Sequence, residues 1–208
     1  KVRDTASELV DGGIALLAKQ QSQDCRINVH LLAHSTGAFV VREAFSYADD
    51  ANKIHSTAWM VSQLCFISGD VSSSSMADDS AVGASIYEHC IRFTNYHNPY
   101  DVALALSNVK RAGFGNRVGR IGLPALVPPS AVDVDCGSYF KSICDRSKDP
   151  FYSHSWYFTD DLFMYDLFHT IGGLTDRAYM DSRTVKDGEL VLTALPSPMP
   201  LVTSPANV

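Results

Sequence analysis

The sequence lacks any apolar run approaching the roughly 20 residues that span a bilayer, so no membrane span is expected. Basic residues are also in deficit, since 17 Lys and Arg stand against 23 Asp and Glu and give a formal net charge of −6. Nucleic acids and anionic membranes attract basic surfaces, so neither is expected as the main partner. Phosphate-loop, dinucleotide-binding and metal-ligand spacings are missing too, and we therefore expect no cofactor and no metal.

Cysteine is scarce, and none of the five cysteines has the C-x-x-C spacing of a zinc site or redox motif. Cys136 and Cys144 lie in one loop-rich region and are candidates for a disulfide in an oxidising compartment. The first residues have none of the layout of a signal peptide, which slightly favours the cytoplasm. An already removed signal remains an alternative, because the chain opens with Lys1 rather than methionine.

The composition is that of an ordinary globular protein, with 46% hydrophobic and 19% charged residues among 208. We expect a single domain over residues 1–195, followed by a flexible Pro/Ser-rich tail at 196–208. Strand-like runs alternate with helical patterns, which predicts βα units and a mostly parallel sheet flanked by helices. The expected strands cover residues 26–33, 63–67, 90–96, 131–136 and 189–195, and the expected helices 2–20, 36–49, 78–89, 102–107 and 160–170. The strand at 131–136 is expected near the sheet edge, and residues 111–129 are expected to form an ordered loop.

The most informative stretch joins a strand to a helix through a short turn that contains Ser35. A serine at such a bend is typical of a nucleophile elbow, in which the strained backbone requires small residues two positions before and two after. Ala33 and Gly37 occupy these positions. An ordinary tight turn between a buried strand and a helix is the alternative interpretation.

A serine nucleophile needs a histidine to take its proton and a carboxylate to orient that histidine. Among seven histidines, only His154 follows all candidate acids, lies in an expected loop and immediately precedes the last long helix. Asp101, a few residues beyond the third expected strand, is the favoured acid. Asp70, directly after the second, is the alternative acid or a turn-forming residue. In a parallel sheet these positions all lie at the carboxyl ends of the strands.

Several segments occur in an order that resembles the bacterial family of α/β hydrolases of unknown function called DUF900. They are residues 31–37, 69–71, 98–104, 117–122 and 154–157, and the resemblance covers about residues 27–170. It implies the α/β-hydrolase fold and an esterase- or lipase-like serine hydrolase, with Ser35, Asp101 and His154 in the triad positions.

One departure from that fold concerns the strands that normally precede the elbow, because a single expected helix comes before it here. We therefore expect the fold to lack its N-terminal strands in this chain. An upstream segment or a second chain is expected to complete the sheet edge and the oxyanion hole. The backbone N–H of Thr36 supplies one oxyanion donor, and the second is not identifiable from the sequence.

The substrate is expected to be a small-molecule carboxylic ester, cleaved through an acyl-enzyme intermediate. The pocket candidates are His34, Tyr100, Trp156 and Tyr157, although each aromatic residue also suits a core position. The arginines of the 111–129 loop either hold an anionic substrate group or are solvated or ion-paired, and the second reading is preferred. The alternatives to a hydrolase are an acyltransferase with the same triad and a non-catalytic, hydrolase-like binding scaffold.

Overall fold

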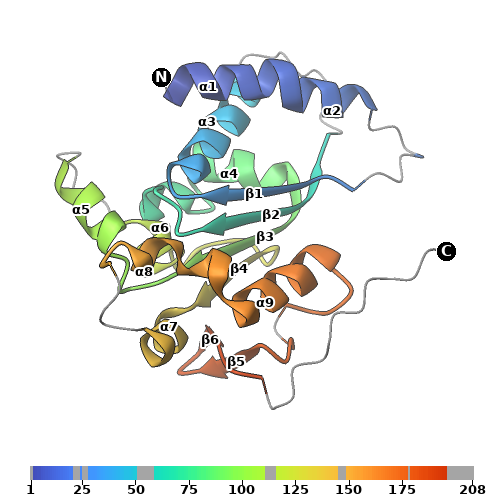
Figure 1. Ribbon diagram of the computed structural model, residues 1–208. Coiled ribbons are helices and arrows are strands. Elements are labelled where there is room, and N and C mark those ends of the chain that lie inside the picture. The colour runs from blue at the N-terminus through green and yellow to red at the C-terminus, as the bar shows by residue number, and fades with distance from the viewer. Residues whose placement is uncertain are drawn as a thin grey trace.

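The computed structural model describes residues 2–20, 24, 28–50, 59–110, 116–144, 149–177 and 179–195. Six strands in these residues form one sheet in the order β1-β2-β3-β4-β6-β5 (Figure 1). They are β1 (His30–His34), β2 (Val61–Ile67), β3 (Cys90–His97), β4 (Ala131–Asp135), β5 (Arg183–Lys186) and β6 (Glu189–Leu192). All neighbours pair in parallel except β5, which is antiparallel to β6. The expected parallel α/β architecture is confirmed.

Helices cover both faces of this sheet. Figure 1 shows α1, α3 and α4 on one side and α8 and α9 on the other. In chain order the helical elements are α1 (Val2–Leu9), the π-helical η1 (Val10–Ile14), α2 (Ala15–Gln20), α3 (Thr36–Asp50), η2 (Ser73–Met76), α4 (Ala81–Glu88), α5 (Val102–Lys110), α6 (Val118–Ile121), α7 (Gly137–Ile143), α8 (Tyr152–Ser155), η3 (Trp156–Thr159) and α9 (Asp161–Gly172).

Strand β2 lies between two hydrophobic cores, which explains its nearly continuous apolar sequence. Leu64 and Phe66 face the core beneath α1, α3 and α4, while Cys65 and Ile67 face the core beneath η3 and α9. Successive side chains of a strand point to opposite faces, so one short run supplies both layers. Each fully buried large apolar side chain contributes about 1.5–3 kcal/mol of transfer free energy.

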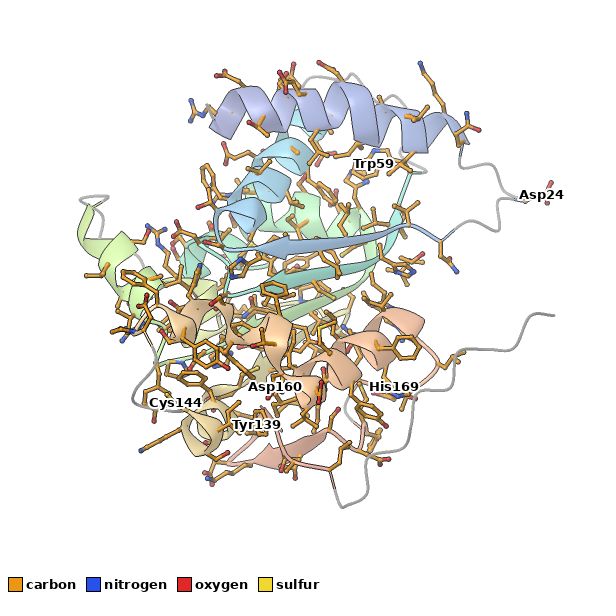
Figure 2. All side chains as sticks on the ribbon, viewed as in Figure 1. Asp24, Trp59, Tyr139, Cys144, Asp160 and His169 are labelled. Carbon is orange, nitrogen blue, oxygen red and sulfur yellow. The ribbon has the colours of Figure 1, made fainter. Side chains whose placement is uncertain are left out.

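Helix α9 has well-defined ends. The Asp160 carboxylate accepts a hydrogen bond from the Phe163 N–H at 2.8 Å, which caps the helix at its N-terminus. Gly173 ends the helix in the left-handed conformation, at φ 66°. Tyr139 donates its hydroxyl proton to the other Asp160 oxygen at 3.0 Å, and the two residues lie side by side in Figure 2. This contact joins α7 to the start of α9, just after the segment that carries His154.

Several boundaries differ from those expected. Strand β1 begins at His30, and residues 26 and 27 lie outside the described part. The expected edge position of residues 131–136 was wrong, because the β5–β6 hairpin adds beyond β4 and makes it an interior strand. Part of the expected 111–129 loop is the short helix α6, and the segment that carries His154 is helical rather than a loop. The described chain leaves β1 paired on one side only, by β2.

The suggested disulfide between Cys136 and Cys144 does not form, since both are free thiols. They flank α7, a helix of seven residues. At about 1.5 Å per residue, such a helix holds its two ends about 10 Å apart, which is too far for a disulfide.

Two further expectations from the sequence concern the tail and membrane-spanning helices. The expected tail at 196–208 lies outside the described residues. Within the described ranges, no helix combines the length and the apolar character that crossing a bilayer requires.

Candidate active site

Ser35 stands at the junction of β1 and α3 in the left-handed backbone conformation, with φ 56°. Its N–H donates to the Ile67 carbonyl at 3.1 Å, and its carbonyl accepts from the N–H groups of Ala38 and Asp70 at 3.1 and 2.9 Å. A non-glycine residue in this region costs about 1–3 kcal/mol and persists where its surroundings hold it. These three hydrogen bonds fix the strained turn and agree with the expected elbow.

The two small residues of the elbow pattern, Ala33 and Gly37, differ in how closely other atoms surround them. Ala33 is buried, as the elbow pattern requires. An added Cβ at Gly37, by contrast, would meet no described atom within 4 Å. The described residues therefore do not account for the expected steric need for glycine at position 37.

Asp101 and His154 are in direct contact. His154 Nδ1 lies 2.7 Å from Asp101 Oδ2, and Asp101 is fully buried. Asp101 immediately precedes α5, and its Oδ1 accepts from the Leu104 N–H at 2.9 Å, as an N-cap does. A carboxylate only accepts, so the His154 proton resides on Nδ1 and leaves Nε2 as the basic nitrogen.

Hydrogen bonds from three sides hold the His154 segment in place. The Asn98 side-chain amide donates to the Ser153 carbonyl at 3.1 Å, and the Val102 N–H donates to Ser153 Oγ at 3.0 Å. His34 Nε2 donates to the His154 carbonyl at 2.8 Å. The loop after β3 and the end of β1 thus fix where the imidazole of His154 lies.

His34 supports His154 by ring contacts as well. Its ring centroid lies 4.5 Å from that of His154 and 5.0 Å from that of Phe158, which it meets edge-on. Burial, reinforced by the nearby His154, lowers the pKa of His34 even though its hydrogen bond to the His154 backbone opposes the shift. His34 therefore stays neutral near pH 7 and adds no charge beside His154.

A cavity of about 360 Å³ lies at the elbow. Its lining contains both Ser35 and His154, together with Thr36, Asp70, Ala103, Leu104, Leu106, Ser107 and Phe151. Leu106 and Phe151 are half exposed, at 47% and 51%. The serine, the histidine and an apolar surface therefore face one space.

Asp70 also lines this cavity but pairs differently from Asp101. Its Oδ1 lies 3.1 Å from Arg117 Nε, and both its carboxylate oxygens accept from Ser107 Oγ at 3.1 Å. The ion pair agrees with the preferred reading of Arg117, whereas Arg111 lies outside the described residues.

The aromatic pocket candidates lie elsewhere. Trp156 and Tyr157 are fully buried in the core beneath α9, so their expected place at the pocket was wrong. Tyr100 is 46% exposed, and Lys141 Nζ lies 5.8 Å from its ring centroid. Trp156 and Tyr157 belong to the short 3-10 helix η3, and in a sequence an aromatic residue suits a core position as well as a pocket wall.

Sequence reasoning missed three polar residues that hold the site together: Ser68, Asn98 and Ser153. Ser68 Oγ donates to Asp101 Oδ2 at 2.7 Å, and the other two anchor the His154 segment. For Ser68 and Asn98 the sequence did offer a signal, namely their position along the chain. They directly follow β2 and β3, so they lie at the carboxyl edge of the sheet, where the site is. In the described residues, no group of three or more His, Cys, Asp or Glu side chains is arranged to hold a metal ion.

Comparison with known proteins supplies the family. Residues 7–129 match the family described as "Alpha/beta hydrolase of unknown function (DUF900)", and this segment is more than half of the chain. The chain belongs to this family. The match includes Ser35 and Asp101 but ends before His154. The place of His154 beside Asp101 therefore rests on the geometry of the site alone. No curated protein and no solved structure matches the chain. Membership in DUF900 assigns an α/β-hydrolase domain but no particular reaction.

Proposed function

We propose that this chain is a serine hydrolase that cleaves carboxylic esters through an acyl-enzyme intermediate. The observation that carries the proposal is a shared cavity. Ser35, at the strained strand–helix junction, faces the same space as His154, whose Nδ1 is bound to the buried Asp101. A nucleophile, a base and a group that orients the base are the parts that acyl transfer requires.

The reaction follows from these roles. His154 Nε2 accepts the hydroxyl proton as Ser35 Oγ attacks the ester carbonyl carbon. The protonated His154 then gives this proton to the departing alcohol, which leaves the acyl group on Ser35. A water molecule attacks the acyl-enzyme while His154 again acts as base, and the carboxylic acid leaves. Asp101 holds the Nδ1–H tautomer and stabilises the imidazolium that forms twice in the cycle.

The developing oxyanion needs backbone donors beside Ser35. Thr36 is the first residue of α3 and lines the cavity, so its N–H is our first donor. The second is proposed to come from a segment or partner chain that pairs with the open side of β1. A structure of a covalent phosphonate adduct tests both assignments, since it locates every donor within about 3 Å of the phosphonate oxygen.

The cavity lining favours an ester with an apolar group. Leu104, Leu106 and Phe151 surround the space beside the nucleophile, and the last two expose about half of their surface. Burying an alkyl chain against them yields about 0.8 kcal/mol per methylene. We therefore expect kcat/KM to increase from acetate esters to esters of longer, still short, aliphatic acids.

The first prediction concerns the nucleophile. Ser35→Ala should abolish covalent labelling by a fluorophosphonate probe, because this reagent reacts with an activated serine hydroxyl. Ser107→Ala is the matched control, since Ser107 lines the same cavity. This variant should be labelled as strongly as the wild type. Labelling of the Ser35 variant at the wild-type level would refute the assignment.

Product analysis separates the alternatives from hydrolysis. An acyltransferase would convert a competing alcohol acceptor to a new ester in preference to releasing the acid. A binding scaffold would fold normally, resist labelling and turn over no short acyl ester.

A further inference from the structure

We propose that Ser68 and Tyr157 form a buried hydrogen-bond chain that positions Asp101 and limits how strongly Asp101 stabilises protonated His154. This inference rests on the proposed function, in which Asp101 and His154 serve as acid and base. It assigns Ser68 and Tyr157 as positioning residues, which act through Asp101 without touching the substrate.

The atoms of the chain are in hydrogen-bond contact. Ser68 Oγ lies 2.7 Å from Asp101 Oδ2 and 3.1 Å from the Tyr157 hydroxyl oxygen, and all three residues are fully buried. Ser68 has a single hydroxyl proton, and the carboxylate can only accept it. This proton goes to Asp101 at the shorter distance and is shared with the Tyr157 oxygen at the longer one. The same Asp101 oxygen receives the His154 Nδ1–H.

Tyr157 presents a neutral hydroxyl to Ser68 rather than a second charge. Its phenol lies in the core beneath α9, and burial raises its pKa well above the ordinary value. The hydroxyl therefore keeps its proton over the whole range in which an esterase would work. A buried hydroxyl also needs a partner, and Ser68 supplies it.

The backbone of Ser68 is strained in a way that glycine would relieve. Its φ is 46°, at the end of β2, and its N–H donates to the Tyr96 carbonyl at 3.1 Å. Helix α6 packs against this turn so closely that a Cβ on Gly119 would clash with the Ser68 carbonyl carbon. A serine at a position that favours glycine keeps its side chain against backbone strain. The strained residue thereby places its hydroxyl within hydrogen-bond distance of Asp101.

The chemical effect is to share the negative charge of Asp101. Its Oδ2 receives two donors, so it has less charge left to stabilise the imidazolium of His154. The other ionisable groups around this cluster are His34, which packs against His154, and the Asp70–Arg117 pair across the cavity. Cys136 neighbours Tyr157 in the core, and burial raises the pKa of its thiol.

The test compares Ser68→Gly and Tyr157→Phe with the wild-type chain in the pH dependence of kcat/KM for a short acyl ester. Glycine suits φ 46°, so relief of the backbone strain offsets part of the lost hydrogen bond, and the first variant should fold. We expect kcat/KM to fall about tenfold in that variant, the effect of losing a hydrogen bond to a charged group. The midpoint of the acid limb should rise by about half a pH unit. Tyr157→Phe leaves the Ser68 proton to Asp101 alone and should shift the midpoint slightly in the opposite direction.

Tyr87→Phe is the matched control, because it removes a buried phenol that donates to the Met76 carbonyl away from the site. Its pH profile should coincide with that of the wild type. Profiles of the two test variants that also coincide with the wild type would overturn the proposal. So would a loss of activity with an unchanged midpoint, which indicates a structural role alone.

A second readout does not depend on turnover. The His154 ring can be titrated by NMR through its Nδ1–H resonance in the wild type and in Ser68→Gly, and the proposal requires the variant to hold the ring proton to higher pH. A wild-type chain that cleaves no ester would refute the proposed function, yet this titration would still decide on the hydrogen-bond chain. Identical titrations would overturn it.

Discussion

At the residue scale, Asp70 and Asp101 both lie near Ser35, and their partners distinguish them. Asp101 receives His154, Ser68 and the Leu104 N–H, whereas Asp70 is bound to Arg117 and Ser107. The sequence left both acids open, because each follows a strand at the same edge of the sheet. The contact with His154 favours Asp101 as the orienting group.

This difference predicts opposite outcomes for two conservative variants. Asp101→Asn should lower kcat by about 10³–10⁴-fold, because an amide can stabilise the wrong His154 tautomer. Asp70→Asn leaves Arg117 without its charged partner, so it should lower the unfolding midpoint while the kcat of folded molecules stays within about tenfold. Steady-state kinetics and thermal melts of both variants measure this. Equal kcat values in the two variants would contradict the choice of Asp101.

At the element scale, the adjacent carboxyl ends of β3 and β4 form a second polar cluster. His97 Nδ1 lies 3.2 Å from Asp133 Oδ1, and its Nε2 lies 3.8 Å from Asp135 Oδ1. Burial lowers the pKa of His97, but the Asp133 hydrogen bond and the charges of Asp133 and Asp135 outweigh burial and raise it overall. This cluster joins the two strands just before the loop that leads to Asp101.

The raised pKa of His97 determines how its contribution to folding stability changes with pH. The folded chain holds the His97 proton more tightly than the unfolded chain, in which the imidazole titrates near pH 6.5. The stabilisation is therefore complete below pH 6.5 and is lost as the pH rises through the folded value. His97→Gln should flatten this part of the profile in urea unfolding between pH 5.5 and 8.5. An unchanged slope above pH 6.5 would exclude His97 as its source.

At the scale of the whole molecule, the C-terminal hairpin is tied to α9 and the sheet by a buried ion pair. Arg183 of β5 makes hydrogen bonds of 2.6 and 2.7 Å to the Asp166 carboxylate of α9, and neither side chain is exposed. Arg183 also donates to the Tyr96 hydroxyl of β3 at 2.9 Å. The pair thus joins β3, α9 and the hairpin that makes β4 an interior strand.

Removing one partner of this pair should be more harmful than removing both. Arg183→Met leaves the Asp166 charge buried without compensation and should cost about 3–5 kcal/mol of unfolding free energy. The double variant Asp166→Asn, Arg183→Met should lose less than that single variant, because no charge remains buried. Urea unfolding of the wild type, the single variants Asp166→Asn and Arg183→Met, and the double variant measures these losses. A double variant that loses the sum of both single losses would argue against direct coupling.

The sequence by itself determined the features that depend on local pattern. Alternating apolar runs and helical periods indicate a parallel α/β sheet, because strand and helix bury their faces with periods of 2 and 3.6 residues. The turn around Ser35 and the order of Asp101 and His154 along the chain were readable for the same reason. The elbow is built from neighbours in sequence, and the carboxyl ends of parallel strands meet at one edge.

Tertiary structure decided everything that depends on which distant segments meet. The contact of His154 with Asp101 rather than Asp70, the burial of Trp156 and Tyr157 and the interior place of β4 each depend on residues far apart in sequence. Ser68 is the clearest case, since its position after β2 places it at the carboxyl edge of the sheet but does not show that it contacts Asp101 or Tyr157. A hydrogen bond forms between whatever donors and acceptors packing brings within about 3 Å, and that packing is a property of the whole fold.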